Sequence, residues 1–160
     1  QGGTNDAEEL NAAVMVTDES VVLAGWTLGN WDGTNAGSYD CAAVKLDVDG
    51  NVLWKWQNGT SSADSVTAAA VLEDGSVVFA IYTEGSWGGP NAGSADFAAV
   101  LLDPDGSELW RWQAGTNGSD FANGVAVGTA GRIVLAGSTD GSWSGTNSGK
   151  QDFAAVMLEA

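Results

Sequence analysis

The sequence predicts an all-β fold made of repeated four-stranded antiparallel units. Three observations support this: one pattern returns at a fixed interval, each copy holds four short strand signals, and glycine is frequent while proline is rare. Among 160 residues there are 23 glycines and 2 prolines. This balance favours short strands joined by tight turns, and it argues against long helices.

The repeat has a fixed spacing of 56 residues. The phrase WDGTNAGSYDCAAVKLD returns as WGGPNAGSADFAAVLLD and WSGTNSGKQDFAAVMLE. Its tryptophan and aspartate recur as Trp31, Trp87 and Trp143 and as Asp40, Asp96 and Asp152, with no insertion between the copies. We therefore expect one repeat domain over 1–160, with copies at 1–56 and 57–112 and an incomplete copy at 113–160.

Four strand signals occur within one period. In the middle of the chain they are 97–102 (FAAVLL), 107–113 (SELWRWQ), 123–127 (NGVAV) and 132–139 (RIVLAGST). DPDGS joins the first two as a hairpin, TAGR joins the last two, and DVDGN and EDGS do the same in other copies. With a longer loop leading to the next unit, each unit is predicted to be a blade of a β-propeller.

The side chains of two strands fit closely stacked blades. Ala, Val and Leu alternate along one face of the first strand, and tryptophans lie two residues apart on the second strand, where they form an apolar plate between adjacent blades. These sets are Ala42, Val44 and Leu46, Ala98, Val100 and Leu102, Ala154, Val156 and Leu158, and Trp54, Trp56, Trp110 and Trp112. The lone Cys41 is expected to be a small buried apolar residue.

The repeat places both ends of the chain inside a unit. Gln1 corresponds to Gln57 at the end of a second strand, and the last copy stops after its first strand. Partial blades are therefore expected at both ends, and three copies are too few to close a ring. Partners would be neighbouring repeats of a longer chain or further chains of a homo-oligomer. A β-trefoil, which also has three four-stranded units, is the alternative fold.

These segments resemble a known repeat. The succession DFAAVLLDPDGSELW, then GT, AV and GRIVLAGST, is similar to the bacterial-type β-propeller repeat (SBBP-like) family, and the similarity extends over essentially the whole chain. The resemblance implies a propeller and a binding or structural module of surface or secreted proteins. The loop W-x-G-(T/P)-N-(A/S)-G-x-x-D makes the present repeat longer than the usual one.

Charge excludes several partners. With 21 acidic and 5 basic side chains the net charge is −16, which repels nucleic acids and anionic membrane surfaces. No run of 18 apolar residues predicts membrane insertion, and the start QGGTNDAEEL is no signal peptide, so any such leader has been removed. An acidic surface suits an extracellular or cell-surface location.

The sequence offers little for catalysis. It has no histidine, and its serines and threonines therefore lack the commonest general base. Adjacent carboxylates such as Glu73 and Asp74 fall in predicted turns, where solvated charge is expected. We expect no enzyme.

The long loops carry recurring oxygen ligands that suit calcium. These are Asn35, Asp40, Asn91, Asp96, Asn147 and Asp152. The alternative, which we favour, is that Asn and Asp cap turns while glycine accepts positive φ. Apart from a possible structural calcium ion, no cofactor is expected.

Aromatic residues are the candidates for ligand contact. Loop tryptophans could stack on sugar rings, and Trp26 and Tyr82 vary between copies, with Ser138 in the third. The loop tryptophans are Trp31, Trp87 and Trp143. The alternative role for these three is packing as a lid over a neighbouring strand. Asn58 and Asn117 begin potential glycosylation sequons.

The sequence thus predicts a non-enzymatic extracellular or surface β-propeller repeat module for protein interaction or self-assembly. The alternative function is a lectin-like carbohydrate-binding module that uses the repeated W-x-G-T-N-x-G loops.

Overall fold

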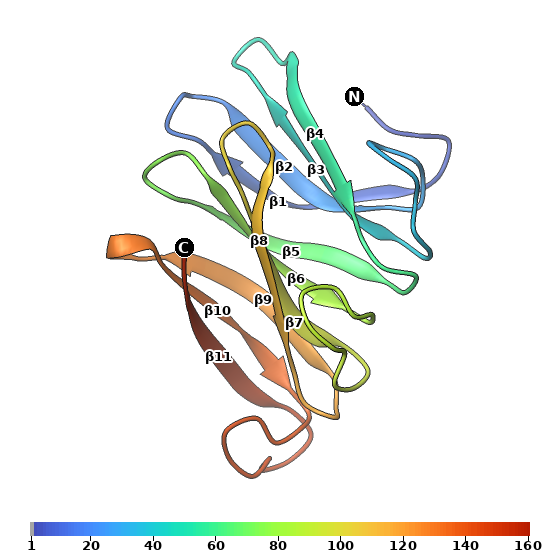
Figure 1. The fold of residues 1–160 in the computed structure, drawn as a ribbon, viewed down its shortest axis with the longest axis vertical. Coiled ribbons are helices and arrows are strands. Elements are labelled where there is room, and N and C mark those ends of the chain that lie inside the picture. The colour runs from blue at the N-terminus through green and yellow to red at the C-terminus, as the bar shows by residue number, and fades with distance from the viewer. Residues whose placement is uncertain (1) are drawn as a thin grey trace.

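The computed structural model describes residues 2–160 and confirms the all-β prediction (Figure 1). Gln1 lies outside the described residues. Within them, the one helical segment is a short 3-10 turn, Thr129–Gly131, and no helix is long and apolar enough to cross a membrane. The strands are β1 (Glu8–Met15), β2 (Val21–Thr27), β3 (Asp40–Leu46), β4 (Val52–Asn58), β5 (Asp64–Val71), β6 (Val77–Thr83), β7 (Asp96–Leu102), β8 (Glu108–Ala114), β9 (Asp120–Val127), β10 (Arg132–Thr139) and β11 (Asp152–Glu159).

The strands form three antiparallel sheets, each in simple chain order. Sheet 1 contains β1 to β4, sheet 2 contains β5 to β8, and sheet 3 contains β9 to β11. The predicted hairpins are confirmed, because β3 pairs with β4, β5 with β6, β7 with β8 and β9 with β10. No sheet formed by residues 2–160 closes on itself, so these strands do not make the barrel that a β-trefoil requires.

The prediction that the strands β7 to β10 form one unit is wrong, because they are divided between two sheets. β7 and β8 complete sheet 2, while β9 and β10 begin sheet 3, so the long loops 28–39, 84–95 and 140–151 lie within sheets. Sheet 1 is therefore complete, although a partial unit was expected there, and sheet 3 has three strands. A fixed interval is the same whichever strand is counted first, so spacing alone does not determine where a sheet begins.

The core lies in two layers between successive sheets. One layer joins Val22 and Cys41 of sheet 1 to Phe79 and Val100 of sheet 2. The other joins sheet 2 to sheet 3. Since every side chain of β7 is buried, the two faces of this strand pack into different layers. As predicted, Cys41 is buried, and the paired tryptophans of β4 and β8 pack against the layers between sheets.

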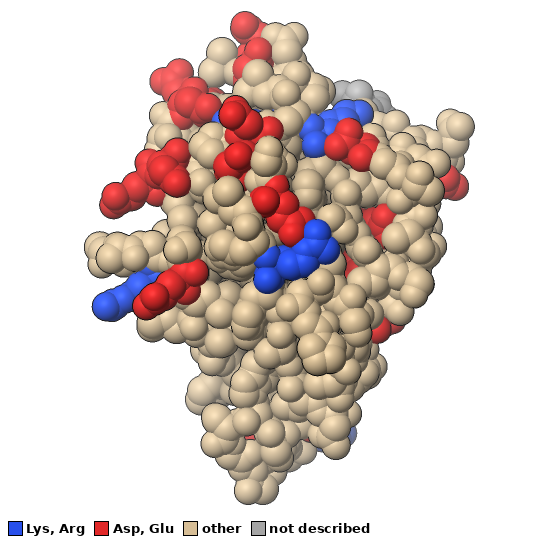
Figure 2. All heavy atoms as spheres, in the orientation of Figure 1, with Lys and Arg blue, Asp and Glu red and all other residues tan. Residues whose placement is uncertain are grey.

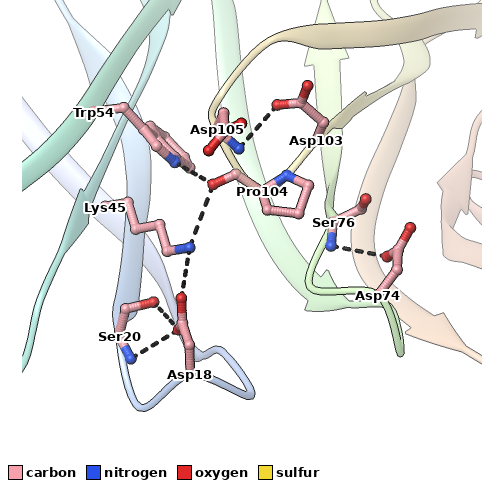
Figure 3. Close-up of polar contacts among 9 residues, drawn as sticks. All are labelled: Asp18, Ser20, Lys45, Trp54, Asp74, Ser76, Asp103, Pro104 and Asp105. Carbon is pink, nitrogen blue, oxygen red and sulfur yellow. Dashed lines mark hydrogen bonds and ion pairs between the residues drawn. The ribbon is translucent and has the colours of Figure 1, made fainter.

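The short turns gather at one end of the sheets and the long loops at the other (Figure 1). Figure 2 shows acidic side chains mainly over the upper left of the molecule, the end that carries the hairpin turns, and few charges on its lower part. At this hairpin end Lys45 Nζ lies 3.0 Å from Asp18 Oδ2 and 3.3 Å from the Pro104 carbonyl, which also accepts a 3.0 Å bond from Trp54 Nε1 (Figure 3). These contacts tie the turns of sheets 1 and 2 together.

Candidate functional site

At the loop end, one glutamine holds each long loop of sheets 1 and 2. Gln113 Oε1 accepts hydrogen bonds from the Trp87 and Gly88 N–H groups, at 2.7 and 3.2 Å. Its Nε2 donates to the Gly85 carbonyl at 2.9 Å and to Asp96 Oδ2 at 2.8 Å. Gln57 makes the same four contacts in sheet 1. The amide therefore closes the loop onto the last strand of its own sheet.

The predicted calcium ligands act as caps within the loops. Asn35 Oδ1 accepts from the Gly37 N–H at 2.9 Å, and Asp40 Oδ2 accepts from the Ala36 N–H at 3.0 Å. Asn91 with Asp96 and Asn147 with Asp152 repeat both contacts. Among residues 2–160 no three Asp, Glu, Cys or His side chains converge as a metal-binding group. The asparagines thus stabilise turns, which agrees with the alternative favoured from sequence.

Two of the loop tryptophans lie across the layers between sheets, and the third, Trp31, lines the outer face of sheet 1. Trp87 stacks on Trp56 of sheet 1, with ring centroids 6.1 Å apart, and Trp143 packs edge-on against Phe97 of sheet 2 at 4.9 Å. Trp31 belongs to the first sheet, and Lys55 Nζ lies 4.3 Å from its ring centroid. Each ring is half-buried, as expected for the packing role.

Trp26 and Tyr82 belong to a row of half-buried aromatic rings across the sheets. Trp26 contacts Tyr39 at a centroid distance of 5.1 Å, the Tyr39 and Tyr82 hydroxyls lie 2.5 Å apart, and Tyr82 contacts Phe121 at 5.3 Å. Burial, followed by the hydrogen bond to Tyr39, raises the pKa of Tyr82 far above its ordinary value. The Tyr82 hydroxyl therefore links sheets 1 and 2 as a neutral group.

Two buried carboxylates at the sheet junctions were not predicted as site residues. Asp64 and Asp120 begin β5 and β9 and are fully buried. Burial raises the pKa of Asp64, whereas hydrogen bonds from Thr83 and Thr60 act in the opposite direction. The available signal was their recurrence 56 residues apart, each a few residues after a G-T dipeptide.

A polar residue at a β-bulge links consecutive sheets and was also missed. The ladder skips Asn11 in β1 and Thr67 in β5. Asn11 Nδ2 donates to the Val66 carbonyl of sheet 2 at 3.0 Å, and Thr67 Oγ1 donates to the Ala122 carbonyl of sheet 3 at 2.6 Å. Asn123 is the equivalent bulge residue of sheet 3, and its side chain is exposed.

The two end sheets each present an uncovered apolar face. On sheet 3, Phe153 is 95% exposed and Met157 is 62% exposed, whereas the equivalent Phe97 and Leu101 are buried in sheet 2. On sheet 1, a hollow of about 460 Å³ faces away from sheet 2. Its lining includes Leu10, Leu23, Trp26, Trp31, Ala42 and Val44.

Comparisons with known proteins bear on the fold alone. No family model matches the chain, and no curated protein matches it. Among solved structures, the chain is similar to a protein of unknown function from Bacteroides caccae, with 11% identity and a TM-score of 0.54. The match covers 94% of the present chain and 46% of that protein, so the chain spans less than half of its length.

Proposed function

We propose that the chain is a non-enzymatic, extracellular or cell-surface β-propeller repeat module, in which the sheets act as blades and the end sheets bind further copies of the same repeat. The observation that carries this proposal is the exposure of Phe153 at a position that is buried wherever a following sheet is present. An exposed apolar patch of this kind is typical of a protein-interaction site.

The internal interfaces provide a template for the missing contact. Phe97 of sheet 2 packs on Trp143 of sheet 3. The Phe97 ring also lies close to Gly137, where an added Cβ would be 3.0 Å from Phe97 Cζ. Moving this contact by one repeat brings Phe153 onto Gly25 and Trp31 of a further copy. Trp31 lines the hollow of sheet 1, so that hollow is the expected receptor for the Phe153 ring.

A polar contact supports the same register. Asn11 and Thr67 each donate to a main-chain carbonyl in the first strand of the following sheet. Shifted by one repeat, Asn123 would donate to the Leu10 carbonyl of a further copy. Both end faces are therefore complementary, and the contact is head to tail. Such a contact generates a closed ring or an open filament.

Carbohydrate binding by the repeated loops has weaker support. Trp87 and Trp143 use one ring face or edge for packing between sheets, Trp87 against Trp56 and Trp143 against Phe97. A lectin-like function would rest on separate hollows, one beside Trp26 and Trp31 and one beside Trp143. A sugar bound in the hollow of sheet 1 would compete with self-association there. Adding sugars to the associating protein therefore compares the two functions directly.

The test is the mass in solution as a function of protein concentration, measured by light scattering after size exclusion. We expect wild-type protein to associate. Phe153→Glu should weaken the association by at least about tenfold, because it places a charge where the contact between chains would bury an aromatic ring. The melting temperature of the monomer should not change, since the side chain is exposed. Leu109→Glu, which changes an exposed apolar residue of sheet 2, is the matched control. Equal association of both variants and wild type would contradict the proposal.

A further inference from the structure

The junction between each pair of sheets contains two buried carboxylates. Asp40 lies opposite Asp64 where sheet 1 meets sheet 2, and Asp96 lies opposite Asp120 where sheet 2 meets sheet 3. Each of the four side chains is at most 1% exposed. An isolated buried carboxylate is costly unless it is paired with a positive charge or loses its own charge.

Both carboxylates of a pair face the same small space. A Cβ on Gly59 would lie 2.5 Å from Asp40 Oδ1 and 3.0 Å from Asp64 Oδ2. A Cβ on Gly115 would lie 2.2 Å from Asp96 Oδ1 and 2.8 Å from Asp120 Oδ2. Glycine at these positions leaves both oxygens uncovered by a side chain, and the arrangement occurs twice with the same atoms.

One oxygen in each pair has no hydrogen-bond donor. Asp64 Oδ2 accepts from the Thr60 N–H at 2.5 Å, and Asp40 Oδ2 accepts from Gln57 Nε2 at 3.0 Å. Within residues 2–160, Asp40 Oδ1 and the equivalent Asp96 Oδ1 are buried and without a partner. Native proteins rarely leave a buried acceptor unsatisfied, so such an atom points to a missing ligand.

Basic side chains do not neutralise these pairs. The ion pairs found among residues 2–160 are Lys45 with Asp18 and Arg111 with Glu108, both away from the junctions. Lys55 lies over the Trp31 ring. Each junction therefore has two acidic groups and no basic partner from the described chain.

We propose that each junction binds one hard divalent cation of the Ca²⁺ type, bridging Asp40 and Asp64 in one case and Asp96 and Asp120 in the other. Carboxylate oxygens are preferred ligands of such ions, and two carboxylates balance a charge of two. The ion would join successive sheets. It differs from the loop site expected from sequence, because the asparagines take no part and Asp64 and Asp120 replace them.

The test measures calcium binding to chelator-treated protein. Calorimetric titration gives the number of bound ions, and the melting temperature shows whether binding stabilises the fold. We expect two Ca²⁺ ions per chain and a melting temperature that rises with Ca²⁺ concentration, because a ligand that binds the folded state stabilises it. Asp40→Asn and Asp96→Asn should each leave one ion, and the double variant none. The asparagine carbonyl can keep the hydrogen bonds that Oδ2 accepts, so these variants should fold.

Surface carboxylates require a control, because the chain carries a net charge of −16. Asp49→Asn and Asp105→Asn change the charge equally in exposed turns, and they should retain both ions. Two results would overturn the proposal. One is a stoichiometry that the junction variants leave unchanged. The other is a melting temperature that Ca²⁺ does not alter but that falls as pH rises, which would assign the neutralising role to a proton.

Discussion

Gln57 and Gln113 show how one side chain fixes a long loop. Each amide contacts two N–H groups, a carbonyl and a carboxylate, which uses both its donor and its acceptor atoms. The recurrence of this glutamine was visible in the sequence, yet spacing did not show what it binds, because its partners are more than 15 residues away. The cap residues Asn35 and Asp40 were predictable, because their partners lie within four residues.

Removing one of these amides should destabilise the fold. Gln113 is buried, so Gln113→Ala would leave up to four polar groups without their partner, and we expect a loss of about 2–4 kcal/mol in the free energy of unfolding. Urea denaturation measures this value. Gln151→Ala changes an exposed glutamine that makes none of these contacts, and its effect should lie within about 0.5 kcal/mol. Equal effects of the two substitutions would contradict the role assigned to Gln113.

At the level of elements, strands and hairpins were predictable and the phase of the sheets was not. DVDGN and DPDGS predicted their hairpins because tight turns are encoded by adjacent residues, and Gly50 and Gly106 adopt the positive φ that these turns need. The segments 59–63 and 115–119 carry the chain between sheets although they are shorter than the loops within sheets. Loop length was therefore a misleading guide to the sheet boundary.

The link between the hairpin turns of sheets 1 and 2 should depend on pH. Hydrogen bonds from Ser20, and then the contact with Lys45, lower the pKa of Asp18 from 3.8 to about 2. Since the folded-state pKa is lowered, the stabilisation is present above about pH 4 and is lost as pH falls through about 2. Asp18→Asn should therefore reduce the melting temperature at pH 6 by about 2–4 °C, as a loss of about 1 kcal/mol would.

The same substitution should have a clearly smaller effect at pH 2, where about half of the wild-type Asp18 carboxyl is protonated. Thermal unfolding followed by circular dichroism at both pH values measures the difference. Asp49→Asn, in an exposed turn, is the control at each pH. A constant difference between wild type and Asp18→Asn across this range would show that the charge of Asp18 does not support the link.

At the level of the whole molecule, the two end faces are the central feature. The alternation of Ala, Val and Leu predicted one common environment for three faces, and this is correct for β7 and β11, which pack toward the preceding sheet. The equivalent face of β3 lines the hollow instead, because sheet 1 has no preceding sheet among the described residues. The difference between these faces follows from the order of the sheets, which sequence spacing did not reveal.

The most direct test of head-to-tail assembly is the mass of a mixture of two variants. Leu10→Glu places a charge on the face of sheet 1, and Phe153→Glu places one on the face of sheet 3; both positions are exposed, so folding should be preserved. We predict that each variant alone is monomeric by light scattering and that an equimolar mixture forms a two-chain species through its one intact pair of faces. If only one variant prevents association, or if the mixture stays monomeric while wild type associates, the head-to-tail account is wrong.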